Sequence, residues 1–138
     1  MILKLSINNE INIFLRESVE MVNWALKNCI GGEILIPKIP SFKITDLAKA
    51  VAPKNKIKII GIRDGEKIHE ELLSKADSQN SYDTPKYYLI LENNKKLINF
   101  YKNKFKAKKV PLGFSYTSDN NKNFLSVKKL RDIVDNFS

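Results

Sequence analysis

Residues 61–70 read GIRDGEKIHE, and this stretch decides how the chain is expected to fold. Residues 57–62, which lead into this stretch and overlap its first two residues, form an apolar run. Such a run predicts a buried strand. A helix is predicted over residues 66–75, because three apolar side chains share one helical face: Ile68, Leu72 and Leu73. The glycines and charged residues between strand and helix then lie on a tight turn.

Arg63, Gly65 and Glu66 give this turn the chemistry of a phosphate and sugar site. An arginine can donate a forked pair of hydrogen bonds to a phosphate, and a glycine lets the backbone come close to a ligand. A glutamate at a helix start can accept hydrogen bonds from sugar hydroxyls. The turn therefore predicts that Arg63 contacts a diphosphate and Glu66 a ribose. In the alternative, both side chains are solvated and Glu66 only complements the helix dipole.

The rest of the chain alternates predicted helices and strands, which favours an α/β fold. The expected helices cover residues 14–27, residues 45–51 with Thr45 as N-cap, and residues 127–136 after a cap at Ser126. The expected strands cover residues 34–36, 56–62 and 87–91, with a rigid loop at 37–41 and a polar, mobile loop at 76–86.

The net charge of +9 is concentrated in the later part of the chain. The basic residues there are Lys95, Lys96, Lys102, Lys104, Lys106, Lys108 and Lys109. Basic residues interleaved with aromatic ones can bind single-stranded nucleic acid. However, Leu97, Tyr101 and Phe105 recur every four residues, as on the inner face of an amphipathic helix. We favour a general affinity for anionic ligands and do not expect nucleic acid as the partner.

The cysteine and histidine content limits the chemistry that this chain can carry. The single cysteine, Cys29, allows no internal disulfide and indicates a reducing cytoplasm. It lies near the end of a predicted helix, where a buried structural thiol is expected. One histidine, His69, and one cysteine cannot form a zinc cluster. No apolar run approaches the ~18 residues that span a bilayer. We therefore expect no metal site and no membrane span.

Three blocks of sequence carry a resemblance to a known family. Residues 32–48 read GEILIPKIPSFKITDLA, residues 60–71 read IGIRDGEKIHEE, and residues 114–131 read FSYTSDNNKNFLSVKKLR. In this order they resemble the bacterial UDP-N-acetylglucosamine 4,6-dehydratases of polysaccharide biosynthesis. These are extended short-chain dehydrogenase/reductases, lyases that serve capsule and lipopolysaccharide sugars. Asp64 stands where the family usually has proline.

The resemblance implies a substrate-binding half without its cofactor half. It places Lys38 and Ser41 near the substrate. In the alternative, they are a surface lysine and part of the N-terminal turn of a helix. The Gly-rich dinucleotide fingerprint of the Rossmann fold is not found, and neither is a helical Tyr-x-x-x-Lys pair. We therefore expect no catalytic residue and no cofactor in this chain, although the intact family member uses NADP.

The predicted domain organisation follows from the same resemblance. Residues 1–13 form a divergent N-terminal edge, in which Glu10 replaces the family arginine. Residues 14–138 form a single, C-terminal substrate-binding domain. The sequence is thus expected to be truncated relative to its family.

The leading hypothesis is the UDP-sugar-binding portion of a 4,6-dehydratase, inactive alone. The resemblance implies that the intact enzyme oxidises C4 of the sugar transiently and eliminates water across C5 and C6. Three alternatives stay open: a fragment of a UDP-sugar 4-epimerase, a non-catalytic remnant or assembly partner, and a basic module that binds anions or nucleic acid. The expected partners are a UDP-sugar, and either a separate Rossmann-half polypeptide or further copies of this chain.

Overall fold

The computed structural model describes residues 2–5, 9–11, 13–62 and 64–136, and the structural statements below concern these residues. The chain has a mixed α/β fold and divides into two compact units. The first unit comprises residues 1–12, 39–70 and 117–138, and the second comprises residues 13–38 and 71–116. Both units are therefore built from segments that are far apart in the sequence.

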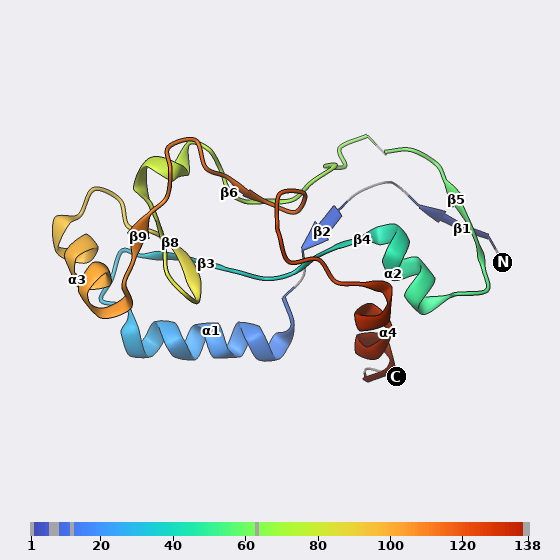
Figure 1. Ribbon diagram of the computed structural model, residues 1–138, viewed down its shortest axis with the longest axis horizontal. Coiled ribbons are helices and arrows are strands. Elements are labelled where there is room, and N and C mark those ends of the chain that lie inside the picture. The colour runs from blue at the N-terminus through green and yellow to red at the C-terminus, as the bar shows by residue number, and fades with distance from the viewer. Residues whose placement is uncertain (1, 6–8, 12, 63, 137–138) are drawn as a thin grey trace. The chain divides into compact units, whose positions relative to one another are not determined.

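The second unit is organised around a four-stranded sheet with the order β3-β8-β7-β9 (Figure 1). The strands pair antiparallel, and Leu89 on β8 lies opposite both Leu35 on β3 and Tyr82 on β7. The elements of this unit are α1 (Leu15–Asn28), β3 (Ile34–Pro37), β6 (Glu71–Leu73), the 3-10 helix η1 (Asp77–Asn80), β7 (Ser81–Asp83), β8 (Tyr87–Ile90), α3 (Lys95–Phe105) and β9 (Lys108–Lys109). Strand β6 pairs with β10 (Tyr116–Thr117), whose Tyr116 also belongs to this unit.

The core of the second unit lies between this sheet and helices α1 and α3. Leu89 and Tyr101 are fully buried in it, and Leu97 on the same face of α3 is nearly so. The prediction that Leu97 and Tyr101 face inward is therefore confirmed. Helix α1 reaches the same core through Trp24, whose ring centroid lies 4.9 Å from that of Tyr87.

Helix α1 buries only part of its apolar surface. The predicted helix over residues 14–27 is confirmed to within one residue at each end. However, four apolar side chains along it are exposed: Leu15 (82%), Val19 (51%), Val22 (54%) and Leu26 (80%). The residues that pack against the core, Met21 and Trp24, lie on another face of the helix.

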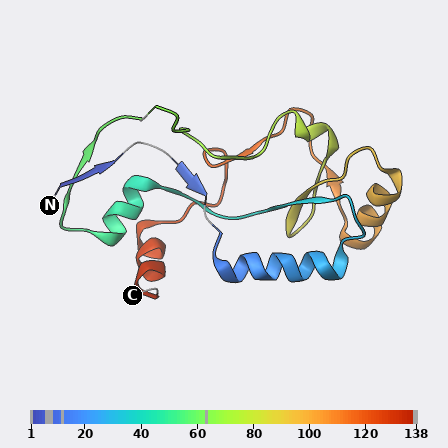
Figure 2. The same cartoon turned by 180° about the vertical axis from the view of Figure 1, so that it is seen from behind.

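The first unit combines two short sheets with a pair of helices (Figure 2). Its elements are β1 (Ile2–Leu5), β2 (Asn9–Ile11), β4 (Ser41–Lys43), α2 (Ile44–Val51), β5 (Lys56–Ile59) and α4 (Val127–Asn136). Strand β1 pairs with β5 in parallel, and β2 pairs with β4 antiparallel. Helices α2 and α4 pack against each other around a small core of Phe42, Ala50 and Leu130.

Two expectations for residues 56–75 are wrong. The strand ends at Ile59, and Ile59, Ile60 and Ile62 are 43 to 49% exposed, so this run is not a buried strand. No helix forms over residues 66–75; the chain turns and then enters β6. The backbone here bonds to distant segments instead, since the Ile68 carbonyl accepts from Asn9 N and the Glu70 carbonyl accepts from Ser118 N.

The expected mobile loop at residues 76–86 is also wrong, because this segment contains η1 and β7. Its serines are buried because their hydroxyls bond to the backbone. Ser78 Oγ donates to the Lys75 carbonyl at 2.6 Å, and Ser81 Oγ donates to the Asp77 carbonyl at 2.7 Å. A polar sequence therefore lies inside the unit with its hydrogen bonds satisfied.

Helix α2 begins at Ile44, with Lys43 and not Thr45 as its N-cap. The reason is that β4 stays paired up to Lys43, opposite Asn9, so the chain passes from strand into helix without an intervening loop. The predicted cap of the last helix is confirmed, because Ser126 Oγ accepts from Lys129 N at 3.3 Å.

Candidate functional site

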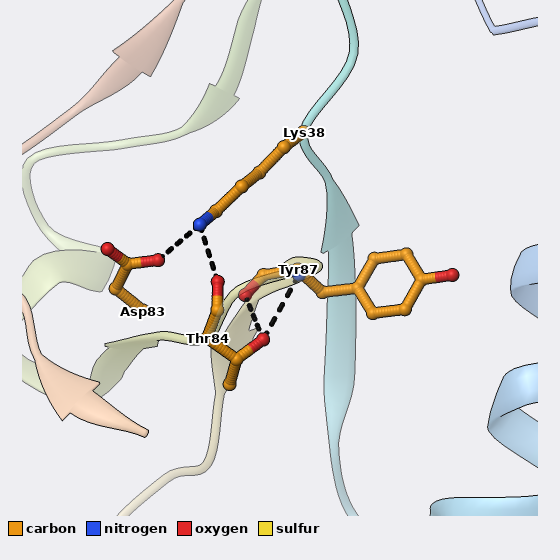
Figure 3. Close-up of polar contacts among 4 residues, drawn as sticks. All are labelled: Lys38, Asp83, Thr84 and Tyr87. Carbon is orange, nitrogen blue, oxygen red and sulfur yellow. Dashed lines mark hydrogen bonds and ion pairs between the residues drawn. The ribbon is translucent and has the colours of Figure 1, made fainter. Parts of the chain in front are cut away.

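Lys38 directly follows β3, and its ammonium group lies at the centre of a polar cluster in the second unit (Figure 3). Its Nζ donates to Asp83 Oδ1 and to the Thr84 carbonyl oxygen, both at 2.5 Å. It also lies 4.7 Å from the centre of the Tyr88 ring, within the range of a cation–π contact. An ammonium has three donors, so these two bonds leave one for a ligand or water.

The partners of Lys38 are themselves fixed by the fold. Thr84 is 4% exposed, and its hydroxyl donates to the Tyr87 carbonyl at 2.7 Å and accepts from Tyr87 N at 3.1 Å (Figure 3). Burial, and then the charge of Asp83, raise the pKa of the Tyr88 phenol above its ordinary value. The Lys38 head group is thus held in one place by a rigid turn between β7 and β8.

A cavity of about 300 Å³ opens beside this cluster. Its walls combine the ion pair with further lysines, and the lining residues are Lys38, Asp83, Thr84, Pro85, Lys106 and Lys108. Three ammonium groups against one carboxylate make the cavity positive, which suits an anionic ligand. Lys38 was the only one of these residues predicted to lie near the substrate, whereas Lys106 and Lys108 belong to the basic segment named from the sequence. Asp83 lies 45 positions away from it, and nothing local in the sequence indicates that the two pair.

Ser41 lies in the first unit and is fully buried. Its Oγ accepts from Asn121 Nδ2 at 2.9 Å, and the same amide donates to the Ile39 carbonyl at 2.7 Å. The Ser41 backbone is bonded as well, to Asn123 and to Leu125. Ser41 thus fastens the C-terminal segment to β4.

The turn at residues 61–66 is only partly described. Arg63, the predicted phosphate contact, lies outside the described residues. Gly61 and Gly65 on either side of it have φ values of +86° and +85°, which favour glycine. Glu66 is exposed and follows the turn without starting a helix. Its predicted role at a helix N-terminus therefore lacks the helix, while the tight turn itself is confirmed.

The structure places these predicted residues in different surroundings. Lys38 belongs to the second unit, whereas Ser41 and Glu66 belong to the first. Ser41 is buried and forms a hydrogen bond with Asn121 of its own unit. Lys38 is half-buried and forms a hydrogen bond with Asp83 of its own unit. Lys38 borders a cavity, and Ser41 does not line it.

His69 and Asp119 form a weak polar pair in the first unit, with Nε2 and Oδ2 3.8 Å apart. The Thr117 hydroxyl donates to Asp119 Oδ1 at 2.6 Å. This bond is the main reason that the pKa of Asp119 is lowered, with His69 contributing less. Both side chains are substantially exposed, which fits a surface pair better than a catalytic one.

A further hydrogen-bonded carboxylate, Glu33, lies at the glycine turn after α1 and was not predicted from the sequence. Glu33 accepts from Ile30 N at 2.7 Å, from Gly31 N at 2.8 Å and from the Tyr101 hydroxyl at 2.8 Å. Burial alone raises the pKa of Glu33, but these hydrogen bonds outweigh it and the net shift is downward. Burial also raises the pKa of Cys29, a half-buried thiol, as expected for a structural cysteine.

The described ranges hold no group of three or more His, Cys, Asp or Glu side chains that could bind a metal ion. No helix in them is both long and apolar enough to cross a membrane.

Comparisons with known proteins agree with the resemblance. A family model described as "Polysaccharide biosynthesis protein" matches residues 10–92. The chain is 46% identical over 127 residues to an inverting UDP-N-acetylglucosamine 4,6-dehydratase of Campylobacter jejuni, covering 88% of this chain and 38% of that protein. It is 40% identical over 121 residues to a UDP-glucose 4-epimerase of Rickettsia akari, covering 83% of this chain and 35% of the epimerase.

A solved structure shows the same fold. Pen from Bacillus thuringiensis superimposes with a TM-score of 0.73 at 24% identity, over 99% of this chain and 41% of that one. The present chain therefore spans well under half the length of each of these relatives.

Proposed function

Because the chain belongs to the polysaccharide biosynthesis protein family, we propose that it is the nucleotide-sugar-binding portion of a UDP-N-acetylglucosamine 4,6-dehydratase-like protein. The observation that carries this proposal is the 46% identity to the Campylobacter jejuni dehydratase across most of the chain. The identity to the epimerase is lower, at 40%. The expected ligand is a UDP-sugar, and the expected location is the cytoplasm.

The binding role is assigned to residues that can neutralise a diphosphate and hold a ribose. Arg63 is proposed to donate a forked pair of bonds to the diphosphate, and Glu66 to accept from the ribose hydroxyls. Lys38 supplies positive charge at the rim of its cavity. Ser41 is proposed to hold the loop of residues 37–41 in place and not to contact the ligand, because its hydroxyl is already bonded to Asn121.

The cofactor of the intact enzymes does not fit the described residues. A dinucleotide site needs a parallel strand, a glycine-rich turn and then a helix whose N-terminus faces the pyrophosphate. Strand β5 has the glycine turn after it, but the chain continues through an irregular segment into β6 and not into a helix. We therefore assign no NADP contact and no catalytic residue to this chain.

Binding of UDP to the purified chain, measured by saturation-transfer NMR, tests the proposal. Uridine signals should be observed with the parent chain and should weaken strongly with Arg63→Ala. Lys54→Ala, a charge-matched change at another exposed turn residue, should leave them unchanged. Equal UDP signals from all three proteins would remove Arg63 from the site. Absence of any signal from the parent would count against the binding function itself.

A 4-epimerase portion is the second candidate, and the Rickettsia akari match favours it. The two relatives differ in the substrate that their names give, UDP-N-acetylglucosamine for the dehydratase and UDP-glucose for the epimerase. Saturation-transfer NMR of this chain with each UDP-sugar separates the candidates. A dehydratase portion should bind UDP-N-acetylglucosamine more tightly, and an epimerase portion should bind UDP-glucose more tightly.

A further inference from the structure

Helix α1 carries a continuous apolar stripe, defined here as Leu15, Val19, Val22 and Leu26. Successive members are separated by four, three and four residues, which places them along one line on a helix. All four are more than half exposed, and the two at the ends are at least 80% exposed. Exposed leucines occur singly on most proteins, but a line of four along one helix is a surface that normally has a partner.

The exposure of the stripe does not come from a poorly docked helix. Helix α1 is anchored on its other side, where the Trp24 ring lies 4.9 Å from Tyr87 and 5.0 Å from Phe105. Met21, one turn before Trp24, packs against the same core. The helix is therefore fixed in its rotation and presents two apolar faces, of which the second unit uses one.

The first unit has an incomplete surface of its own. Strands β1 and β5 form a two-stranded parallel sheet, and parallel sheets are normally covered on both faces. Yet Ile59 at the end of β5 is 49% exposed, and the next isoleucine, Ile60, is 43% exposed. Apolar surface is thus left uncovered in each of the two units.

We propose that the stripe of α1 is the docking surface for the polypeptide that corresponds to the rest of the dehydratase relatives. This chain matches only 38% of the Campylobacter jejuni protein, so more than half of that protein is available to supply the cover. The partner surface is an apolar helix or sheet face. This inference does not rest on the proposed ligand.

A second copy of the chain fits the stripe less well. The helix has 14 residues and is about 21 Å long, so two copies would share only two heptads. Coiled-coil pairing is sustained over about three to four heptads or more. A pair of α1 helices alone would also bury less than the ~1,200 Å² of a stable interface.

Thiol labelling measures directly whether the stripe is covered by the partner polypeptide. In a Cys29→Ser background, Val22→Cys reports on the stripe, and Lys27→Cys is the exposed control on the same helix. Each is placed in this chain alone and in a chimaera that joins the chain to the unmatched part of the Campylobacter jejuni dehydratase. Both thiols should react fast with maleimide in the chain alone. In the chimaera Val22→Cys should react at least about tenfold more slowly, because labelling then needs local opening, whereas Lys27→Cys should not change.

Two results would overturn the proposal. Equal reactivity of Val22→Cys in the chain and in the chimaera means that the remainder does not cover the stripe. Slow reactivity in the chain alone means that the chain itself or a second copy already covers it, and sedimentation at the same concentration distinguishes these two.

A second variant keeps the inference testable if the chimaera does not fold. Val22→Asp in the chain alone should leave the melting curve unchanged, since the site is exposed; a lowered melting temperature contradicts the free stripe. The unmatched part of the relative, coexpressed as a separate chain, should copurify with the parent and not with Val22→Asp. Copurification of both, or of neither, would refute the docking surface.

Discussion

The two units differ in how far each completes its own core. The second unit has a four-stranded sheet with fully buried Leu89 and Tyr101, and its buried polar groups are bonded. The first unit has two-stranded sheets and a core of three buried residues. It is held together by the C-terminal segment, which bonds to β4 through Asn121. The second unit therefore resembles a complete domain, whereas the first depends more on hydrogen bonds from the C-terminal segment and on surfaces that it does not supply.

Leu89→Ala should have the largest effect and tests the core of the second unit. Leu89 is fully buried between two strands, so the cavity left behind should lower the free energy of unfolding by about 2–5 kcal/mol. Trp24 is the only tryptophan and packs on this core, so its fluorescence during urea unfolding reports on this unit. Leu26→Ala, the same change at an 80% exposed position, is the control and should cost little. Similar losses from the two variants would mean that the sheet is not the core.

Arg63→Ala tests which unit holds the ligand charge. A charge-assisted bond contributes roughly 1.5–3 kcal/mol, so UDP binding to the completed protein should weaken about 10- to 150-fold. Arg63→Lys should recover little, because an ammonium cannot make the forked contact. Glu66→Gln should cost less, since an amide oxygen still accepts from a hydroxyl. Calorimetry gives the order. If Lys38→Met in the second unit proves more damaging than Arg63→Ala, the ligand is held chiefly by the Lys38 cavity.

Asn121→Ala tests the hydrogen bonds that join the C-terminal segment to β4 in the first unit. The change removes the hydrogen bonds to Ser41 Oγ and the Ile39 carbonyl and leaves Ser41 buried without this partner. The expected loss is about 1–3 kcal/mol. It should be observed by far-ultraviolet circular dichroism, while Trp24 fluorescence, which reports on the second unit, should change less. Lys122→Ala beside it is exposed and serves as the control. A loss reported equally by both signals would show that the units unfold as one.

The sequence predicted the elements whose pattern is local. Helix α1, strand β8 and the inward face of α3 follow from spacing alone, and each was found where expected. The segment at residues 66–75 was predicted as a helix because Ile68, Leu72 and Leu73 were assigned to one helical face. In the structure Ile68 belongs to the first unit and is exposed, whereas Leu73 is buried in the second. Periodicity cannot reveal that one short segment serves two units.

Residues of the candidate site could be predicted from the sequence, but the contacts that they make could not. Lys38 was identified from the family resemblance, yet its partners Asp83 and Thr84 lie in a segment predicted as a mobile loop. Ser41 was expected beside the substrate, and its burial depends on Asn121, 80 residues further along the chain. Both contacts arise only when distant segments pack together, so no local pattern carries them.

Glu33→Gln should have the smallest effect on stability, and that effect should depend on pH. The folded-state pKa of Glu33 is below its ordinary value because hydrogen bonds from Ile30 and Tyr101 outweigh the effect of burial. A lowered pKa means that this stabilisation is fully present above the ordinary glutamate pKa of about 4.3 and is lost as the pH falls through the folded-state value. Solvent screening limits it to about 1 kcal/mol or less. Melting curves followed by Trp24 fluorescence should therefore fall less steeply below pH 5 for Glu33→Gln than for the parent, and the two proteins should differ most near neutral pH. Glu71→Gln, at an exposed carboxylate of the same unit, is the control. If Glu33→Gln and the parent lose stability in parallel as the pH falls, the carboxylate does not fasten the turn after α1.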